Sequence, residues 1–286
     1  MIDFHTHPVM IKELVEADPD FGRAVREVFG LLFPPQPLEI LRREMDAAGI
    51  ERAVILALDL STAHGCRVPD NETVARLAES EPRLIGFASV DPNLPDAAER
   101  LDGAVRRLGL RGLKLDPSLQ RFDPGDRSRA YPLYRLAGEL GIPVLLHAGM
   151  SWAPPGVSRL SRPVLLEEAL SDHPGTNFVL AHFGWPWTDE ALMLALKHRN
   201  LYLDTSVVYA RTPAETLRKV VAEHIGLPVL EGSLPDRILF GSNYPRQDMR
   251  RAARGIASLG FSPGLLEAIT RGNAARLLGL ETEARP

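Results

Sequence analysis

The sequence predicts an α/β protein: a single (β/α)8 TIM barrel with extra C-terminal helices and a long loop after the first strand. Short apolar runs rich in β-branched residues recur eight times, and each precedes a longer stretch whose apolar residues have helical spacing. Most of these runs are almost continuously hydrophobic, which is typical of parallel strands buried on both faces. Eight such units close a barrel, and we expect residues 1–286 to form one domain.

The expected strands and helices alternate regularly along the chain. The strands are expected at residues 2–5, 53–58, 84–90, 112–115, 144–147, 178–182, 201–204 and 238–241. The helices are expected at 38–48, 71–80, 96–108, 131–140, 163–172, 189–198, 213–223 and 248–258, with a C-terminal helical pair near 263–279. Glycine and proline mark the helix ends, as in Gly141-Ile142-Pro143 before the fifth strand.

Two connections are longer than a normal strand-to-helix loop. Residues 8–36 carry a helical pattern of their own, and residues 148–162 are rich in proline, glycine and serine. Both follow the carboxyl end of a strand, so both would lie over the mouth of the barrel. Long loops at this place usually form lids or substrate walls.

The composition is that of an ordinary globular protein and excludes several classes. The chain has 33 basic and 37 acidic residues, a net charge of -4, which argues against a nucleic-acid surface. The first residues lack the features of a signal peptide, and no stretch is long and apolar enough for a membrane span. We therefore expect a cytoplasmic protein without a membrane partner. The single cysteine, Cys66, excludes an internal disulfide and a cysteine-built metal site.

Histidines stand at the predicted carboxyl ends of three strands, where the active site of a TIM barrel lies. His5 and His7 end the first strand, and residues two apart on a strand point to the same face. His147 ends the fifth strand, His182 ends the sixth, and Asn243 follows the eighth. The barrel would bring these side chains together on one rim.

This group of imidazoles predicts a catalytic metal site. Imidazole is the commonest metal ligand among side chains, and a metal with an open position lowers the pKa of bound water and polarises substrate oxygen atoms. The alternative for His5 and His7 alone is a buried core pair. Four histidines on one predicted rim favour the metal site.

Five segments also carry a family resemblance, in order and over nearly the whole chain. They are Asp3–His7 (DFHTH), Gly112–Leu115 (GLKL), Pro143–His147 (PVLLH), Ala181–Gly184 (AHFG) and Phe240–Pro245 (FGSNYP). Together they resemble the amidohydrolase superfamily, and in particular its amidohydrolase-related branch. That branch contains amino-carboxymuconate-semialdehyde decarboxylase, resorcylate decarboxylases and a range of hydrolases, so the motifs are specific for the superfamily but not for a substrate.

The resemblance implies roles for individual positions. His5, His7 and His147 match metal ligands, which implies one divalent metal ion, zinc with manganese as the alternative. His182 matches the histidine that assists the metal-bound water or the substrate. Lys114 matches a fourth-strand lysine that is common in this branch.

Asn243 departs from the family pattern, which has an aspartate that binds the metal and moves a proton. An asparagine oxygen can bind a metal, but the amide carries no charge and cannot act as a base. Three outcomes stay open: histidines hold the metal with Asn243 as a weak ligand and His182 as the base, the site is metal-free, or the protein is inactive or altered. The presence of all four histidines favours the first.

Further residues near the predicted strand ends each have two interpretations. Lys114 is a site cation or an ion-pair partner, and Asp204 orients a histidine or caps a helix. Arg246 binds a substrate carboxylate or forms a surface ion pair. Aromatic side chains in the loops wall a planar substrate or pack the lid; these are Tyr209, Trp152, Trp185 and Trp187.

Of the remaining histidines, His64 is expected to have a loop role, with contact to the substrate as the alternative, and the other three are expected to have no role in the chemistry. His64 lies in a loop beyond the second strand, next to Cys66. His173, His198 and His224 fall in or at the ends of outer helices, where solvated or capping histidines are usual.

The leading hypothesis is a metal-dependent hydrolase that acts on a small amide, ester or lactone. The alternatives are a non-oxidative decarboxylase of an aromatic or dienoic acid and, because of Asn243, a non-catalytic barrel that binds a small ligand. In each case the expected partner is a small molecule. Relatives with a long first loop often dimerise, so the resemblance allows a homodimer.

Overall fold

The computed structural model describes residues 1–280 and contains the eight strands that the sequence predicts. Each lies within a few residues of its expected position. They are β1 (Ile2–Thr6), β2 (Arg52–Leu56), β5 (Leu84–Phe87), β6 (Leu113–Leu115), β7 (Val144–Leu146), β8 (Phe178–Leu180), β9 (Leu201–Asp204) and β10 (Ile238–Leu239). All are short and almost entirely buried, because helices cover one face and the barrel interior covers the other.

The strands pair in parallel in two arcs, β1-β2-β5 and β10-β9-β8-β7-β6. A parallel bridge between Ala88 and Leu113 links β5 to β6. At the other junction the amide of Phe4 donates to the carbonyl of Phe240 at 2.8 Å, and a bridge joins Thr6 to Tyr244. These contacts complete the ring, and the predicted (β/α)8 TIM barrel is confirmed.

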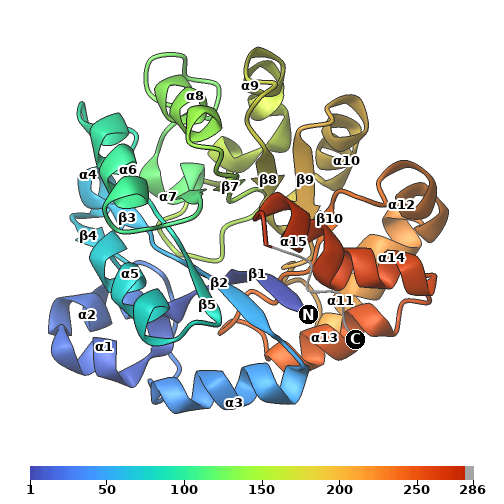
Figure 1. Ribbon diagram of the computed structural model, residues 1–286, viewed down its shortest axis with the longest axis horizontal. Coiled ribbons are helices and arrows are strands. Elements are labelled where there is room, and N and C mark those ends of the chain that lie inside the picture. Colours follow the sequence, from blue (N-terminus) through green and yellow to red (C-terminus); the bar gives the residue numbers. More distant parts are fainter. Residues whose placement is uncertain (281–286) are drawn as a thin grey trace.

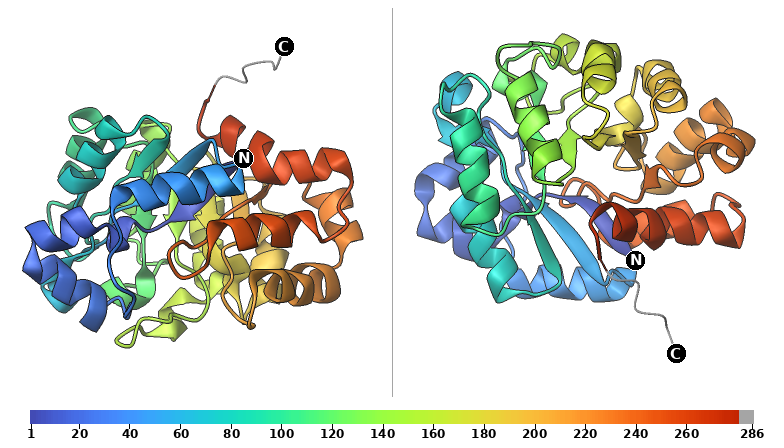
Figure 2. Two further views of the ribbon diagram at one scale, coloured as in Figure 1. Left: turned by 90° about the horizontal axis from the view of Figure 1, so that it is seen from below. Right: turned by 45° about the horizontal axis from the view of Figure 1, so that its top comes forward.

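The outer helices encircle the strands, as Figure 1 shows. They are α3 (Leu38–Ala48), α5 (Asn71–Ser80), α6 (Ala97–Arg106), α8 (Tyr131–Glu139), α9 (Glu167–Asp172), α10 (Thr188–Lys197), α11 (Pro213–Leu217) and α13 (Met249–Ala257). α3 and α5 occupy the residues expected for them. The helix expected at 213–223 continues from α11 as the π-helix η5 (Arg218–Ile225). α3 and α13 lie side by side, which is visible in Figures 1 and 2.

The C-terminal helices close one end of the barrel. α14 (Pro263–Glu267) and α15 (Asn273–Leu277) are joined by the π-helix η6 (Ala268–Gly272). Ala274, Ala275 and Leu278 belong to the same buried cluster as the inward-facing strand residues Phe4 and Phe87. The barrel interior is therefore filled at this end, and polar chemistry is confined to the opposite end.

The loops over that opposite end contain more structure than the sequence predicts. The segment after β1 folds into η1 (Pro8–Met10), α1 (Lys12–Ala17) and α2 (Pro19–Glu27), which agrees with its predicted helical pattern. The segment after β2 forms a small hairpin, β3 (Asp59–Leu60) and β4 (Cys66–Arg67), with α4 (Ser61–His64) between its strands. Two short helices were also not predicted: α7 (Pro117–Gln120), which follows β6, and α12 (Leu227–Ser233), which precedes β10 and so lies in a connection at the amino end of the strands. Two-residue strands and single helical turns leave no clear periodic signal in a sequence.

Short 3-10 segments complete the loops after β7 and β8. They are η2 (Ser158–Ser161), η3 (Pro163–Leu166) and η4 (Ala181–Gly184). Among residues 1–280, none of the helices combines the length and the apolar character that a membrane crossing requires.

Candidate active site

The first strand directs two imidazoles to the carboxyl end of the barrel. His5 and His7 are both buried, and their Nε2 atoms lie 3.1 Å apart. Gly241, after β10, gives His5 its space: a Cβ atom at position 241 would lie 2.9 Å from the Cβ of His5 and 3.3 Å from that of Ser206. A larger residue at this position would collide with His5 and Ser206.

A second pair of imidazoles comes from the neighbouring strand ends. His147 follows β7, His182 follows β8, and His147 Nδ1 lies 3.1 Å from His182 Nε2. The two pairs adjoin, because the rings of His5 and His182 have centroids 4.9 Å apart. The structure thus brings together the four histidines that the sequence placed on one rim.

Hydrogen bonds identify the protonated nitrogen of two of these rings. His5 Nδ1 donates to Asp204 Oδ2 at 2.8 Å, and His182 Nδ1 donates to the backbone carbonyl of Ser206 at 2.9 Å. A carbonyl or carboxylate oxygen can only accept, so the proton of each neutral ring is on Nδ1. The lone pairs of His5 Nε2 and His182 Nε2 therefore face the other two histidines.

The two remaining rings each have a nitrogen without a partner. If His7 donates from Nε2 to His5, and His147 donates from Nδ1 to His182, lone pairs are left on His7 Nδ1 and His147 Nε2. Both atoms are buried and have no hydrogen-bond partner among the described residues. Buried polar atoms are normally satisfied, so these two nitrogens indicate a place for a ligand.

Burial keeps all four imidazoles neutral. It lowers the pKa of His5, His7 and His182 well below the usual histidine value, and it lowers the pKa of His147 as well. The cationic Lys114 lowers each of them further. Neutral imidazole is the form that binds a metal or accepts a proton.

Two other ionisable groups in the barrel have strongly shifted pKa values. Lys114, on β6, is only 2% exposed, and burial lowers its pKa to about 8 in spite of the nearby carboxylates of Asp116 and Asp204. Asp3, below the histidines on β1, is fully buried, and burial raises its pKa to about 7. Groups perturbed to this extent in a pocket are typical of functional sites.

The side chain of Asn243 lines the same pocket. Its Nδ2 donates to the carbonyl of Ser206 at 3.2 Å, and its backbone amide donates to the carbonyl of His5 at 2.9 Å. The backbone of Asn243 has a φ of 59°, and that of His182 has a φ of 61°, a region that residues other than glycine rarely adopt. Such conformations cluster at functional sites because the surrounding structure has to hold them.

The mouth of the pocket is closed by side chains from three loops. Arg246, after β10, donates to the carbonyl of Phe29 at 2.5 Å, and its guanidinium lies over the Phe29 ring. Phe29 in turn lies edge-on to His7, with ring centroids 4.9 Å apart. Trp152 also lines the pocket, and its Nε1 donates to the carbonyl of Val208 at 3.0 Å.

The enclosed cavity has a volume of only about 30 Å³. Pockets that hold small molecules usually measure roughly 300–1,000 Å³. The pocket in this conformation is therefore smaller than a bound substrate would need.

The other aromatic candidates lie away from this pocket. Tyr209 stacks on Trp185 with centroids 4.5 Å apart, and Lys219 Nζ lies 5.7 Å from its ring centre. Neither Tyr209 nor Trp185 is among the residues that line the pocket, and Trp187 contacts Arg162 instead. The structure thus does not bring Tyr209 to the predicted substrate site, because its ring packs on the loop after β8.

Three side chains have the donor types and the spacing for a metal ion. His5, His182 and Asp204 each offer one ligand atom, and these atoms lie within 4.8 Å of one another. Ser206 Oγ already lies between them, 3.1 Å from His5 Nδ1 and 2.7 Å from His182 Nδ1, and it donates to Asp204 Oδ1. These atoms satisfy one another, so the nitrogens on the pocket side of the rings are the better candidates for a metal.

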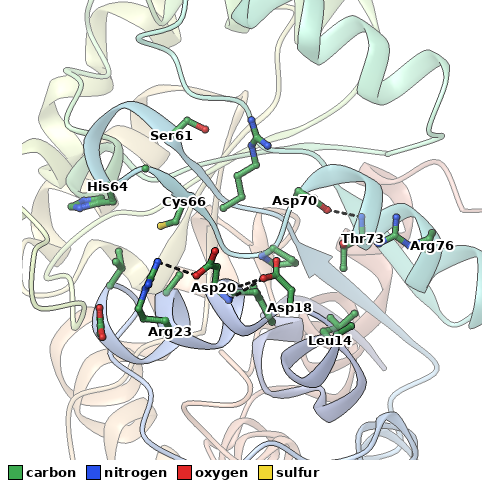
Figure 3. Close-up of a pocket in the computed structure, with 18 residues that line it drawn as sticks. Leu14, Asp18, Asp20, Arg23, Ser61, His64, Cys66, Asp70, Thr73 and Arg76 are labelled. Atoms are coloured by element: carbon green, nitrogen blue, oxygen red, sulfur yellow. Dashed lines mark hydrogen bonds and ion pairs between the residues drawn. The ribbon is translucent and has the colours of Figure 1, made fainter.

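A larger cleft lies outside the barrel, between α2 and the β3–β4 hairpin (Figure 3). It has a volume of about 670 Å³, but several of its charged groups already have partners. Asp18 and Asp70 accept backbone amides at helix starts, and Asp20 pairs with Arg23 at 3.1 Å. His64 lines this cleft and its Nε2 lies 3.1 Å from the carbonyl of Leu119, so it does not reach the histidine cluster.

Sequence reasoning missed two residues of the inner site. Ser206 contacts both histidine pairs, and Asp116, which follows β6, lines the pocket with Oδ2 4.0 Å from His147 Nδ1. Both are polar residues one or two positions beyond a strand end, which is the signal that could have found them. For Asp204, the structure shows the orienting contact to His5.

Fold and site together define a class of protein. At the carboxyl ends of its strands the parallel barrel carries four neutral histidines, the buried Lys114 and the buried carboxylates of Asp116 and Asp204. This is the arrangement of a catalytic (β/α)8 barrel. The amidohydrolase family model matches residues 2–280, and the chain belongs to this family. The protein is thus an enzyme, and the predicted resemblance is confirmed.

Solved structures share the barrel fold over the whole described chain. An uncharacterized TIM-barrel protein from Bordetella bronchiseptica is 27% identical, with a TM-score of 0.77 and 98% of each chain covered. A Pseudomonas putida protein assigned as a 2-pyrone-4,6-dicarboxylic acid hydrolase is 22% identical, with a TM-score of 0.70 and coverage of 99% of this chain and 98% of that one. A Polaromonas dihydroxybenzoic acid decarboxylase with bound manganese is 20% identical, with a TM-score of 0.64 and coverage of 98% and 96%. No curated protein sequence matches the chain.

Proposed function

We propose that the protein is a metal-dependent hydrolase that cleaves a small carboxylated ester, lactone or amide. In this reaction water adds across the acyl bond: its oxygen joins the acyl carbon, and a proton goes to the leaving oxygen or nitrogen. The observation that carries the proposal is the group of four buried, neutral imidazoles: His5 Nε2 and His7 Nε2 lie 3.1 Å apart, and His147 Nε2 is buried without a partner among the described residues.

The donor set fits a divalent metal ion. His5, His7 and His147 would hold it, with the amide oxygen of Asn243 as an additional weak ligand. Two nitrogens bound to one tetrahedral zinc at roughly 2.0–2.1 Å lie about 3.3 Å apart. The separation of 3.1 Å between His5 Nε2 and His7 Nε2 agrees with this value. When bound, zinc or manganese supplies Lewis-acid chemistry, which polarises a substrate oxygen and lowers the pKa of water.

His182 is the proposed proton acceptor. Its Nδ1 hydrogen is held by the carbonyl of Ser206, so Nε2, which lies 3.1 Å from His147 Nδ1, carries the lone pair that can take a proton. Burial keeps the ring neutral. Asn243 cannot perform this role, because an amide has no basic atom at neutral pH.

The cations of the pocket favour an anionic substrate. Arg246 has no acidic partner within ion-pair distance in the described part of the chain, and burial lowers its pKa to about 10. An unpaired, largely buried guanidinium is costly, and its planar fork matches a carboxylate. We propose that Arg246 and Lys114 bind the substrate carboxylate, with Trp152 covering the bound molecule.

The protonation states of the site favour hydrolysis over decarboxylation. Replacement of a carboxylate by a proton needs a good acid next to the substrate carbon. The four imidazoles are held neutral and position 243 is an amide, so bases outnumber the proton donors, Lys114 and Arg246, in this site. Hydrolysis uses a base at its first step.

A non-oxidative decarboxylase is the second candidate. One observation favours it: Lys114, with its pKa lowered to about 8, is a buried proton donor in the pocket. Decarboxylases with this fold are among the similar structures. Its substrate would be an aromatic or dienoic acid, as the sequence resemblance implies.

An assay of product chemistry separates the two candidates. The protein is stripped of metal, reloaded with zinc or manganese, and offered carboxylated lactones and esters alongside carboxylated aromatics. We expect metal-dependent release of acid, measured in a pH-stat, without carbon dioxide. Release of carbon dioxide from the aromatic acids, or hydrolysis that does not depend on metal, would contradict the proposal.

A variant at position 243 tests the third possibility, a non-catalytic binding barrel. Asn243→Asp restores the acidic residue of the family pattern, and we expect it to raise metal affinity and turnover of the same reaction. Absence of bound metal and of turnover in both the parent protein and the variant would favour the binding barrel.

A further inference from the structure

Ser206 is buried at the point where four strand ends meet. Its hydroxyl lies within hydrogen-bond distance of His5 Nδ1, His182 Nδ1 and Asp204 Oδ1. Its backbone carbonyl accepts from His182 Nδ1 at 2.9 Å and from Asn243 Nδ2 at 3.2 Å. A single residue thus contacts side chains from the ends of β1, β8, β9 and β10.

The direction of these hydrogen bonds follows from the number of available protons. A hydroxyl has one proton, and the short contact to Asp204 Oδ1 assigns that proton to the carboxylate. Toward His5 and His182 the hydroxyl oxygen can then only accept, so both rings have to present an Nδ1 proton to it.

Asp204 completes the arrangement through its two oxygens. Oδ1 accepts from the Ser206 hydroxyl, from the Ser206 amide at 3.0 Å and from the His182 amide at 2.8 Å. These three donors fix the plane of the carboxylate. Oδ2 is left to accept from His5 Nδ1 at 2.8 Å.

We propose that Ser206 is a positioning residue that holds His5 and His182 in the tautomer with the proton on Nδ1. Both rings then turn the bare Nε2 atom toward the pocket, where His7 and His147 lie. The relevance to catalysis rests on the proposed function, because a metal ligand and a proton acceptor both need a free lone pair. The tautomers themselves exist without metal or substrate.

Ser206→Ala removes the shared acceptor while leaving the backbone carbonyl in place. Asp204 Oδ2 and the Ser206 carbonyl still accept from His5 and His182 in this variant, so the Nδ1-protonated forms stay the major ones. We expect a minor Nε2-protonated form of each ring to appear beside them. Ser161→Ala is the matched control, because Ser161 is buried and its hydroxyl has no hydrogen-bond partner among the described residues. It removes the same atom from a comparable environment.

Long-range proton–nitrogen NMR correlation measures the tautomers directly in the metal-free, full-length protein labelled with ¹⁵N-histidine. His5→Gln and His182→Gln assign the signals. The parent protein and Ser161→Ala are expected to show the Nδ1-protonated form for both rings. An Nε2-protonated form of either ring in the parent protein would overturn the proposal, and this outcome does not depend on whether Ser206→Ala folds. Spectra of a folded Ser206→Ala that match the parent would also overturn it.

Zinc affinity, measured by competition with a chromophoric chelator, gives a second readout. Loss of a residue that orients metal-binding histidines weakens binding by about 10- to 100-fold. We expect this loss for Ser206→Ala and no change for Ser161→Ala. Equal affinities for the two variants would contradict the positioning role. A parent protein with the expected tautomers but no hydrolase activity would refute the proposed function and leave the role of Ser206 intact.

Discussion

The inner pocket and the outer cleft differ in size and in how far their polar groups are paired. The smaller of the two holds the unpaired buried groups. The outer cleft has a volume of about 670 Å³, whereas the inner cavity has about 30 Å³. In the cleft, exposed charges pair with one another or cap helices, as Asp20 does with Arg23. In the inner pocket, His7 Nδ1 and His147 Nε2 are buried without a partner. Unpartnered imidazole nitrogens grouped in one pocket, and not empty volume, therefore mark the functional site.

Substitution of a histidine in each region should give the largest contrast. His182→Gln removes the proposed proton acceptor, and loss of a general base lowers kcat by roughly 10²- to 10⁴-fold. His64→Gln in the outer cleft should leave kcat unchanged, because His64 contacts only a backbone carbonyl there. Steady-state kinetics on the hydrolysed substrate measures both. Equal losses of kcat in His182→Gln and His64→Gln would show that the inner pocket is no more important for catalysis than the outer cleft.

Substitution of an arginine in each region should give a smaller difference, seen in KM for the substrate. Arg246→Gln removes a charged hydrogen-bond donor worth about 1.5–3 kcal/mol, which corresponds to a roughly 10- to 150-fold higher KM for a carboxylated substrate. Arg76→Gln, in the outer cleft, should leave KM unchanged because Arg76 is exposed and contacts Thr73. A KM that is insensitive to Arg246→Gln would show that this residue does not bind the substrate.

Lys114 should make stability depend on pH in a defined window. Burial lowers its folded-state pKa to about 8 from the ordinary lysine value of 10.5. The folded state thus binds fewer protons than the unfolded state between these values, so the free energy of unfolding rises with pH there. The rise amounts to about 3 kcal/mol, from 1.36 kcal/mol per pKa unit.

Urea denaturation between pH 7.5 and 10.5 measures this rise. Lys114→Met should lack it relative to the parent protein, whereas Lys12→Met should retain it, because Lys12 is exposed and pairs with Glu16. Parallel pH profiles for the parent protein and Lys114→Met would show that the pKa of Lys114 is not lowered in the folded protein.

Cys66 in the outer cleft should give the smallest effect. Its thiol is partly buried, and burial raises its pKa, which lowers its reactivity. Cys66→Ser should leave catalysis unchanged and alter the free energy of unfolding by about 0.5 kcal/mol or less. A large loss of activity would show that the cleft has a function of its own.

The sequence predicts the barrel closely because its signals are local and repeated. The apolar runs that form the eight barrel strands and the helical spacing that forms α3 and α5 are set by short stretches of chain. The β3–β4 hairpin and α7 depend on single turns and tertiary packing, which leave no periodic pattern.

The site residues divide in the same way. His5, His7, His147 and His182 stand at strand ends, so the barrel topology alone indicates that they lie close together. The role of Ser206 depends on how the chain turns after β9, and the packing of Tyr209 on Trp185 depends on two loop conformations. Neither can be derived from the spacing of residues.

The most direct test of the metal site is X-ray absorption spectroscopy of the zinc-loaded protein. The first coordination shell should contain about three imidazole nitrogens at roughly 2.0–2.1 Å from the zinc, and this signal should be lost in the His7→Ala, His147→Ala double variant. A shell made only of oxygen atoms, or zinc retained unchanged by the double variant, would contradict the account.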